Sequence, residues 1–315
     1  MRHILGVLFS IIAVTGNARG VDFDASMLSQ CLALANDPTN AELREKFEVH
    51  PNNVLMKEGL PDRFQISYEQ ISQQRERLQN YSDILPALKK QLATLSAEAT
   101  EFLGPNAIPE NFSIRIVCGA RYDGFGFASD GKQYLFMNLP VISADFFPHL
   151  LRHELWHVGY RNQNEETAKV YEGSSSSLKN LSYIMLNEGV GHYYSLRRRL
   201  EPKIVYDNWP ERTKALFTKF HDKFDQLVNA EDTETKDELL WTSTAGGRFW
   251  DKWGAVTGAV ITYRLKQKLG VEVLRSLITS GPCDFLSKYH EEAKQIENWE
   301  NIPDTLVQTT CSVSN

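Results

Sequence analysis

The stretch LLRHELWHVGY, residues 150–160, places His153 and His157 four positions apart, with Glu154 directly after the first histidine. Most of the other positions are apolar, which predicts a helix packed against a core. Four residues of an α-helix cover about 400 degrees, so both imidazoles leave the same face one turn apart. In this geometry the two rings can share a metal ion.

Zinc is the metal that suits two neutral imidazoles and a carboxylate, with a fourth position left open for water. Glu154 lies about 100 degrees around the helix from His153, where it can reach that water without binding the metal. Such a carboxylate accepts a proton as water attacks a carbonyl and then passes it to the leaving amine. The pattern predicts a zinc-dependent hydrolase with Glu154 as general base and acid.

The third metal ligand has its best candidates in MLNEGVGHYY, residues 185–194. Glu188 lies 31 positions after His157, and a helical hairpin can bring it beside the histidines. His192 shares its helix face, so His192 is either a residue that orients a ligand or itself the third ligand, with Glu188 in support. We expect Glu188 to be the ligand. The structural alternative treats both as satisfied polar groups between packed helices, although the nearby glycines indicate a close approach there.

HELWH followed by LNEGVGHYY resembles the gluzincin group of zinc metallopeptidases, and LNEG is similar to the sequence around the glutamate ligand of zinc aminopeptidases. The resemblance covers about 45 residues. It implies that His153, His157 and Glu188 bind Zn²⁺ and that the substrate is a peptide or protein. The aminopeptidase sequence GAMEN is missing, so binding of a free substrate N-terminus is not implied. The nearer overall match is to uncharacterised bacterial families of zinc-dependent peptidases, which have a C-terminal run similar to residues 254–289 here.

The predicted fold is α+β and predominantly α: zincin-like, with a small β-sheet upstream of the metal-binding helix and a helical C-terminal half. FSIRIVCG, residues 112–119, and QYLFMNL, residues 133–139, are typical of strands, and the Asp-Gly pair in SDGK predicts a tight hairpin. By the gluzincin resemblance, residues 134–139 are either an edge strand that binds extended substrate or a plain buried strand.

The negative charge that develops on a substrate carbonyl needs a hydrogen-bond donor. For each candidate alone, a structural role is the simpler interpretation. His192, Tyr193 and Tyr263 are the residues that we single out as orienting a ligand or stabilising the transition state. The other eligible donors are Tyr194, Arg264, Tyr289 and His290.

The predicted helices surround this sheet in sequence. Before it, one helix that ends at Gly104 is predicted by the spacing of Leu85, Leu88, Leu92, Leu95 and Ala99. A partner helix ahead of it is suggested by Tyr68, Ile71 and Leu78. After it, helices are expected at about 143–160, 178–200, 210–229, 249–269, 271–280 and 284–294. Residues 161–177 are polar and predict a loop, with room for one short helix.

Three regions follow from these patterns: a signal peptide over 1–20, an N-terminal helical region over 21–105 and a zincin-like catalytic region over 106–315. The N-terminal region is either a packed annex or a regulatory prosegment; no processing site marks the latter. Arg2, an 11-residue apolar run and small residues up to Gly20 are typical of an export signal, and the run is too short to span a membrane. We therefore expect an exported protein, periplasmic or extracellular, without a membrane span in the mature chain.

Four cysteines in an exported chain favour two disulfides, and three pairings are possible. Proximity near the C-terminus favours Cys283 with Cys311, which leaves Cys31 with Cys118. The formal net charge of −6 makes nucleic acid a poor partner. Two further hypotheses remain beside the peptidase: a zinc-binding protein that uses the site for structure, partner binding or hydrolysis of another bond, and a helical interaction protein without metal.

Overall fold

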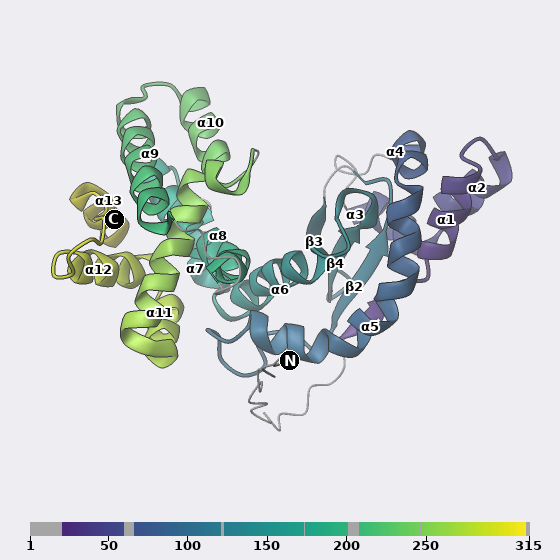
Figure 1. The fold of residues 1–315 in the computed structure, drawn as a ribbon, viewed down its shortest axis with the longest axis horizontal. Coiled ribbons are helices and arrows are strands. Elements are labelled where there is room, and N and C mark those ends of the chain that lie inside the picture. The colour runs from purple at the N-terminus through teal and green to yellow at the C-terminus, as the bar shows by residue number, and fades with distance from the viewer. Residues whose placement is uncertain are drawn as a thin grey trace, which may run out of the picture.

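The computed structural model describes residues 21–59, 66–120, 123–172, 174–200, 208–245 and 247–312. The fold is mostly helical with one small sheet near the N-terminus, as the sequence predicts. Figure 1 shows two groups of elements, with helix α6 (Phe147–Gln163) between them. The signal peptide predicted over residues 1–20 lies outside the described residues.

The sheet has four strands in the order β1-β2-β4-β3. Their bounds are Asp22–Asp24 for β1, Phe112–Val117 for β2, Gly124–Ser129 for β3 and Lys132–Asn138 for β4. β1, β2 and β4 are parallel neighbours, and β3 pairs with β4 antiparallel. Asp130 and Gly131 join β3 to β4, and both have positive φ, at 49° and 71°. This two-residue loop confirms the predicted Asp-Gly hairpin.

Residues 134–139 do not form an edge strand. β4 lies between β2 and β3, so its backbone is paired on both sides, and β3 is the edge strand of the hairpin. Side chains alternate between the two faces of β3. Gly124 faces Glu154 of α6, whereas the ring of Phe127 lies against Gly59 of another helix on the opposite face. The sheet is therefore covered by helices on both faces at this edge.

The N-terminal region is helical, as predicted. Its elements are α1 (Leu28–Asn36), α2 (Ala41–Glu48), α3 (Pro51–Gly59), α4 (Tyr68–Gln73) and α5 (Arg75–Ala99). The apolar stripe of α5 is buried from Leu78 to Ala99. Leu78 belongs to α5 rather than to the partner helix ahead of it, because α4 and α5 meet at Gln74.

The predicted helical hairpin is formed by α6 and α8 (Ser177–Leu200), with the short α7 (Glu165–Glu172) between them. Pro148 sits in the first turn of α6, where its missing N–H costs nothing. The remaining helices are α9 (Trp209–Asn229), α10 (Thr233–Thr244), α11 (Trp253–Ser280), α12 (Pro282–Ala293) and α13 (Asp304–Cys311). Two short 3₁₀ helices, η1 (Leu139–Val141) and η2 (Phe249–Asp251), precede α6 and α11. Gly270, with φ 81°, kinks α11 where two separate helices are predicted.

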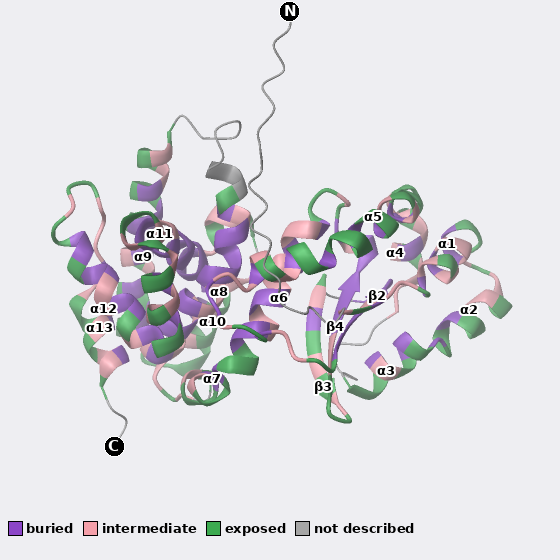
Figure 2. Cartoon of the chain, turned by 90° about the horizontal axis from the view of Figure 1, so that it is seen from below, coloured by how far each residue is buried: buried purple, intermediate pink, exposed green. Residues whose placement is uncertain are grey.

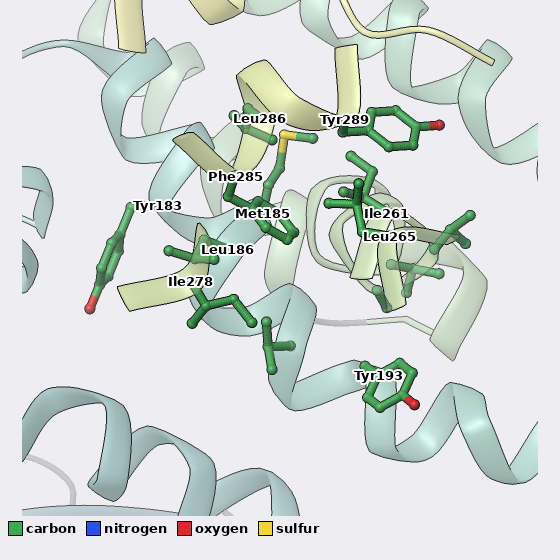
Figure 3. Packing of buried hydrophobic residues seen from close by; sticks show 14 of the residues in the cluster. Tyr183, Met185, Leu186, Tyr193, Ile261, Leu265, Ile278, Phe285, Leu286 and Tyr289 are labelled. Atoms are coloured by element: carbon green, nitrogen blue, oxygen red, sulfur yellow. The ribbon is translucent and has the colours of Figure 1, made fainter. Parts of the chain in front are cut away.

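The buried side chains form two hydrophobic clusters that meet within α6. The first cluster contains α1–α5, the sheet and α6 up to Leu155. The second begins at Trp156 and contains α8, α9, α11 and α12, together with residues 102–107 that follow α5. Figure 2 shows buried positions on both sides of α6, and Figure 3 shows how α8 and α11 pack with α12 in the second cluster. Because of this arrangement, α6 is anchored in both cores.

Two disulfides are present, and they are the pairs favoured above. Cys31 of α1 is bonded to Cys118 just after β2, and Cys283 of α12 is bonded to Cys311 of α13. Cys31 and Cys118 both belong to the first hydrophobic cluster. None of the helices in the described part of the chain combines the length and the apolar character that crossing a membrane requires. The division at residue 105 stays a prediction.

Candidate metal centre

His153 and His157 of α6 meet Glu188 of α8 at the crossing of these two helices. The Nε2 atoms of the histidines lie 3.0 Å apart. Each of them lies 3.5 Å from one oxygen of the Glu188 carboxylate. Among the described residues this is the one group of three or more His, Cys, Asp or Glu side chains whose ligand atoms converge enough to hold a metal ion. The helical hairpin thus brings together all three residues that the sequence predicts as ligands.

The spacing of these atoms suits zinc. A tetrahedral zinc ion with ligand distances of about 2.0–2.1 Å separates its ligand atoms by roughly 3.4 Å, close to the distances found here. The Glu188 side chain is not fully enclosed, since 27% of it is exposed. Burial would raise the pKa of Glu188, but His157 and His153 outweigh it and hold that pKa well below its usual range. The carboxylate is therefore ionised, as a metal ligand must be.

Asn187 determines which nitrogen of His157 faces this site. Its side-chain oxygen lies 3.0 Å from Nδ1 of His157, and an amide oxygen only accepts hydrogen bonds. Nδ1 of His157 therefore donates to Asn187, and Nε2 is the nitrogen that faces Glu188. Burial would lower the pKa of His157, but Glu188 outweighs it and raises that pKa to about 9, so a metal ion would have to displace the proton from Nε2. The backbone oxygen of Asn187 also accepts a hydrogen bond of 2.7 Å from the Trp156 indole, so one residue joins the two helices twice.

A glycine on α8 makes room for the ring of His153. A Cβ atom at Gly191 would lie 2.7 Å from Nδ1 of His153, which is closer than packed atoms approach. A second glycine, Gly189, meets Gly258 of α11 on another side of α8, where a Cβ would lie 2.7 Å from the backbone. The close approach that the glycines predict is therefore present on two sides of the helix that carries Glu188.

Glu154 lies beside the three candidate ligands, against the start of β3. A Cβ atom at Gly124 would lie 3.0 Å from Oε1 of Glu154, so the glycine leaves space for this carboxylate. Burial raises the pKa of Glu154, and the nearby carboxylates of Glu188 and Asp123 raise it further, against the opposing effect of the two histidines. A carboxylate whose pKa is raised toward neutrality is better suited to accept and return a proton.

His192 occupies the position of a residue that orients the ligands. Its Nδ1 lies 3.0 Å from the backbone oxygen of Glu188, to which it donates a hydrogen bond, and its ring packs edge-on against His153 with centroids 4.7 Å apart. Its Nε2 lies 3.1 Å from Nζ of Lys252, whose ammonium can only donate. With both nitrogens engaged, His192 has no lone pair for a metal. Burial, His153 and Lys252 lower its pKa well below the usual range, so the ring is neutral.

Tyr193 and Tyr263 have their rings packed against residues outside the candidate ligand set. Tyr193 is about 140 degrees around α8 from Glu188, and its ring packs against Phe102 and below the ammonium of Lys266. Tyr263 packs on Trp209, with ring centroids 6.1 Å apart. The remaining eligible donors are engaged in structural contacts: Tyr194 with the backbone of Ala99, Arg264 and Tyr289 with Glu300, and His290 with Asp304.

Two residues of the site were missed by the sequence reasoning. Asn187 directly precedes Glu188 in α8. This adjacency was a signal that the Asn187 side chain can reach His157, the histidine that faces Glu188. Lys252 is 60 positions away from His192 and lies outside any motif. Only the path of the chain between α10 and α11 brings it to the site.

A His-Glu-x-x-His helix completed by a carboxylate from a later helix is the donor arrangement of zinc metallopeptidases. The family model described as "Putative zinc dependent peptidase (DUF5700)" matches residues 18–298, and the chain belongs to this family. No match was found among curated proteins or among solved structures.

Proposed function

We propose that the chain is an exported zinc-dependent peptidase in which His153, His157 and Glu188 bind the metal and Glu154 is the general base and acid. The observation that carries this proposal is the convergence of two imidazole nitrogens and one carboxylate, with the Glu154 carboxylate beside them. The family description supports the zinc dependence and the peptide substrate.

Bound zinc would polarise the substrate carbonyl and the attacking water. Glu154 takes a proton from that water as the water oxygen bonds to the carbonyl carbon. It then donates this proton to the amide nitrogen as the carbon–nitrogen bond breaks, so that peptide and water become a carboxylic acid and an amine. Asn187 holds the ring of His157 in the required tautomer, and His192 supports the turn of α8 that carries Glu188.

β3 is the strand along which we expect the substrate to bind. It is an edge strand, and its first residue, Gly124, contacts Glu154. An extended peptide that pairs with a sheet edge binds chiefly through backbone hydrogen bonds, with side-chain contacts adding selectivity. Such a peptide would pass directly beside the metal-binding residues.

Export is supported by the two disulfides, because such bonds form and persist in oxidising compartments. We propose that residues 1–20 direct the chain out of the cytoplasm and are removed near Gly20.

The variant Glu154→Gln tests the proposal. It keeps the shape of the side chain but removes the proton acceptor, so we expect zinc content to stay at one ion per chain while cleavage of an internally quenched peptide library slows by about 10²–10⁴-fold. Zinc is measured by elemental analysis of protein purified without added metal. Glu166→Gln, on the exposed side of α7, is the matched control and should cleave at the wild-type rate.

Two results would contradict the proposal. Absence of zinc from purified wild-type protein would support the interaction protein without metal. Undiminished function in Glu154→Gln that still holds zinc would support a site used for structure or partner binding.

A further inference from the structure

Lys252 lies between η2 and α11, and its ammonium group is partly buried beside the candidate metal centre. Its Nζ donates a hydrogen bond of 3.1 Å to Nε2 of His192. In the part of the chain that the structure describes, no carboxylate pairs with it; the adjacent Asp251 instead contacts Lys219 at 3.2 Å and accepts a hydrogen bond from the backbone N–H of Arg248. Partial burial of an ammonium group without a paired anion costs free energy. A role in binding or catalysis would explain why the chain keeps a lysine here.

The chain holds this ammonium close to the metal-binding residues. One imidazole ring separates it from Glu188, because Nδ1 of His192 lies 3.8 Å from Oε2 of that carboxylate. The ring of His192 is itself fixed, by its bond to the Glu188 backbone and by Phe249, which stacks on it with centroids 5.9 Å apart. His192 thus holds the Lys252 ammonium group in place through its Nε2.

Glu154 and Lys252 approach the centre from different parts of the molecule. Glu154 lies against β3, whose strand belongs to the first hydrophobic cluster, whereas Lys252 directly precedes α11, which belongs to the second. A carboxylate from one cluster and an ammonium group from the other thus lie near the three candidate ligands. Four of the donors considered from sequence are bonded to other groups: Tyr194, Arg264, Tyr289 and His290. Lys252 is instead hydrogen-bonded to His192, which contacts Glu188.

We propose that Lys252 is a catalytic residue whose ammonium group donates a hydrogen bond to the carbonyl oxygen of the bound peptide as that oxygen becomes negatively charged. The inference rests on the proposed peptidase function and deepens it. When the water oxygen bonds to the carbonyl carbon, the second electron pair of the C=O bond moves to the oxygen, which Lys252 stabilises electrostatically. Lys252 keeps its proton throughout, and the water proton goes to Glu154.

The test compares Lys252→Met, which removes the charge, with Lys252→Arg, which keeps it. The substrate is a quenched peptide that the wild type cleaves, prepared with a free and with an amidated C-terminus, and the binding probe is the phosphinic analogue of that peptide. We expect Lys252→Met to lower kcat by about 10²–10³-fold on both peptides, with KM changed little. The dissociation constant of the phosphinic analogue should rise in parallel, because its oxygens carry the charge that Lys252 would stabilise.

Zinc content and the thermal unfolding midpoint are measured on the same proteins, and both should match those of the wild type. Lys252→Arg should recover part of the lost kcat. Lys219→Met removes the neighbouring exposed lysine and is the matched control, for which no change in kcat is expected.

Each other outcome overturns the inference. A wild-type kcat in Lys252→Met does so while leaving the proposed function intact. A loss confined to the peptide with a free C-terminus would make Lys252 a binder of the substrate carboxylate. Lys252→Met could instead lose zinc, or could lose affinity equally for the phosphinic analogue and for the unmodified product. Either result would mean that Lys252 only supports His192. A wild type that cleaves no peptide overturns the inference together with the proposed function.

Discussion

The hydrogen bonds made by each histidine ring decide whether one of its nitrogens can bind a metal ion. His157 donates from Nδ1 to Asn187, so its Nε2 is available to a metal ion. His192 is bonded at both nitrogens, so it can only support its neighbours. The sequence left open whether His192 or Glu188 is the third ligand. The decision required the position of Lys252, which no local pattern reveals.

Asn187→Ala should weaken zinc binding by about 10–100-fold, because His157 loses the acceptor that fixes its tautomer and ring orientation. The hydrogen bond from Trp156 to the backbone oxygen of residue 187 remains in this variant, so the helix crossing itself is kept. Zinc affinity is measured by competition with a chelator of known affinity.

Asn187→Asp is the matched control, since it keeps an oxygen that accepts from Nδ1 of His157. We expect it to bind zinc at least as tightly as the wild type. Equal zinc affinity in Asn187→Ala and the wild type would show that packing alone orients His157.

At the scale of elements, the contact between α8 and α11 sets the position of Glu188. The helices approach so closely at Gly258 that a Cβ atom there would lie 1.9 Å from the backbone oxygen of Met185. Backbone atoms cannot rotate away as a side chain can, so one helix must shift. A shift of α8 moves Glu188 relative to the histidines of α6.

Gly258→Ala should therefore lower the free energy of unfolding by about 1–3 kcal/mol or more, and should also weaken zinc binding. Chemical denaturation gives the first quantity and chelator competition the second. Gly104→Ala is the comparison, because the nearest atoms to its Cβ belong to the flexible side chain of Gln163, at 3.3 Å. If Gly258→Ala and Gly104→Ala have the same free energy of unfolding, the tight contact between α8 and α11 is not a determinant of stability.

The elements that strong patterns predict are present, and the weakly patterned ones were missed. The apolar stripe of α5 and the paired histidines of α6 have a clear helical period, and both helices form where expected. α10 and α13 were not predicted, since each buries only two side chains and their sequences are largely polar. β1 has three residues, and its pairing with β2 spans about 90 positions that no local rule connects.

Across the whole molecule, the two disulfides close loops of different length. Cys31–Cys118 spans 87 residues, and Cys283–Cys311 spans 28. A crosslink restricts the unfolded chain more when the loop is longer, with an entropic contribution of roughly 4.6 kcal/mol for the first loop and roughly 3.6 kcal/mol for the second.

Replacing Cys31 and Cys118 together by Ala should therefore destabilise the protein more than replacing Cys283 and Cys311, by about 1 kcal/mol. Both double variants are compared with the wild type by chemical denaturation under oxidising conditions. A larger loss in the Cys283/Cys311 variant would mean that anchoring of α13 on α12 outweighs loop entropy.

The border between the hydrophobic clusters falls between Leu155 and Trp156, inside the sequence HELWH. Helix α6, which carries both imidazoles and Glu154, therefore depends on both cores for its position. A fragment that begins at α6 would contain all four side chains but would lack the sheet and the first core, against which α6 packs. We therefore expect that the short stretch carrying these side chains would not keep their geometry as an isolated peptide.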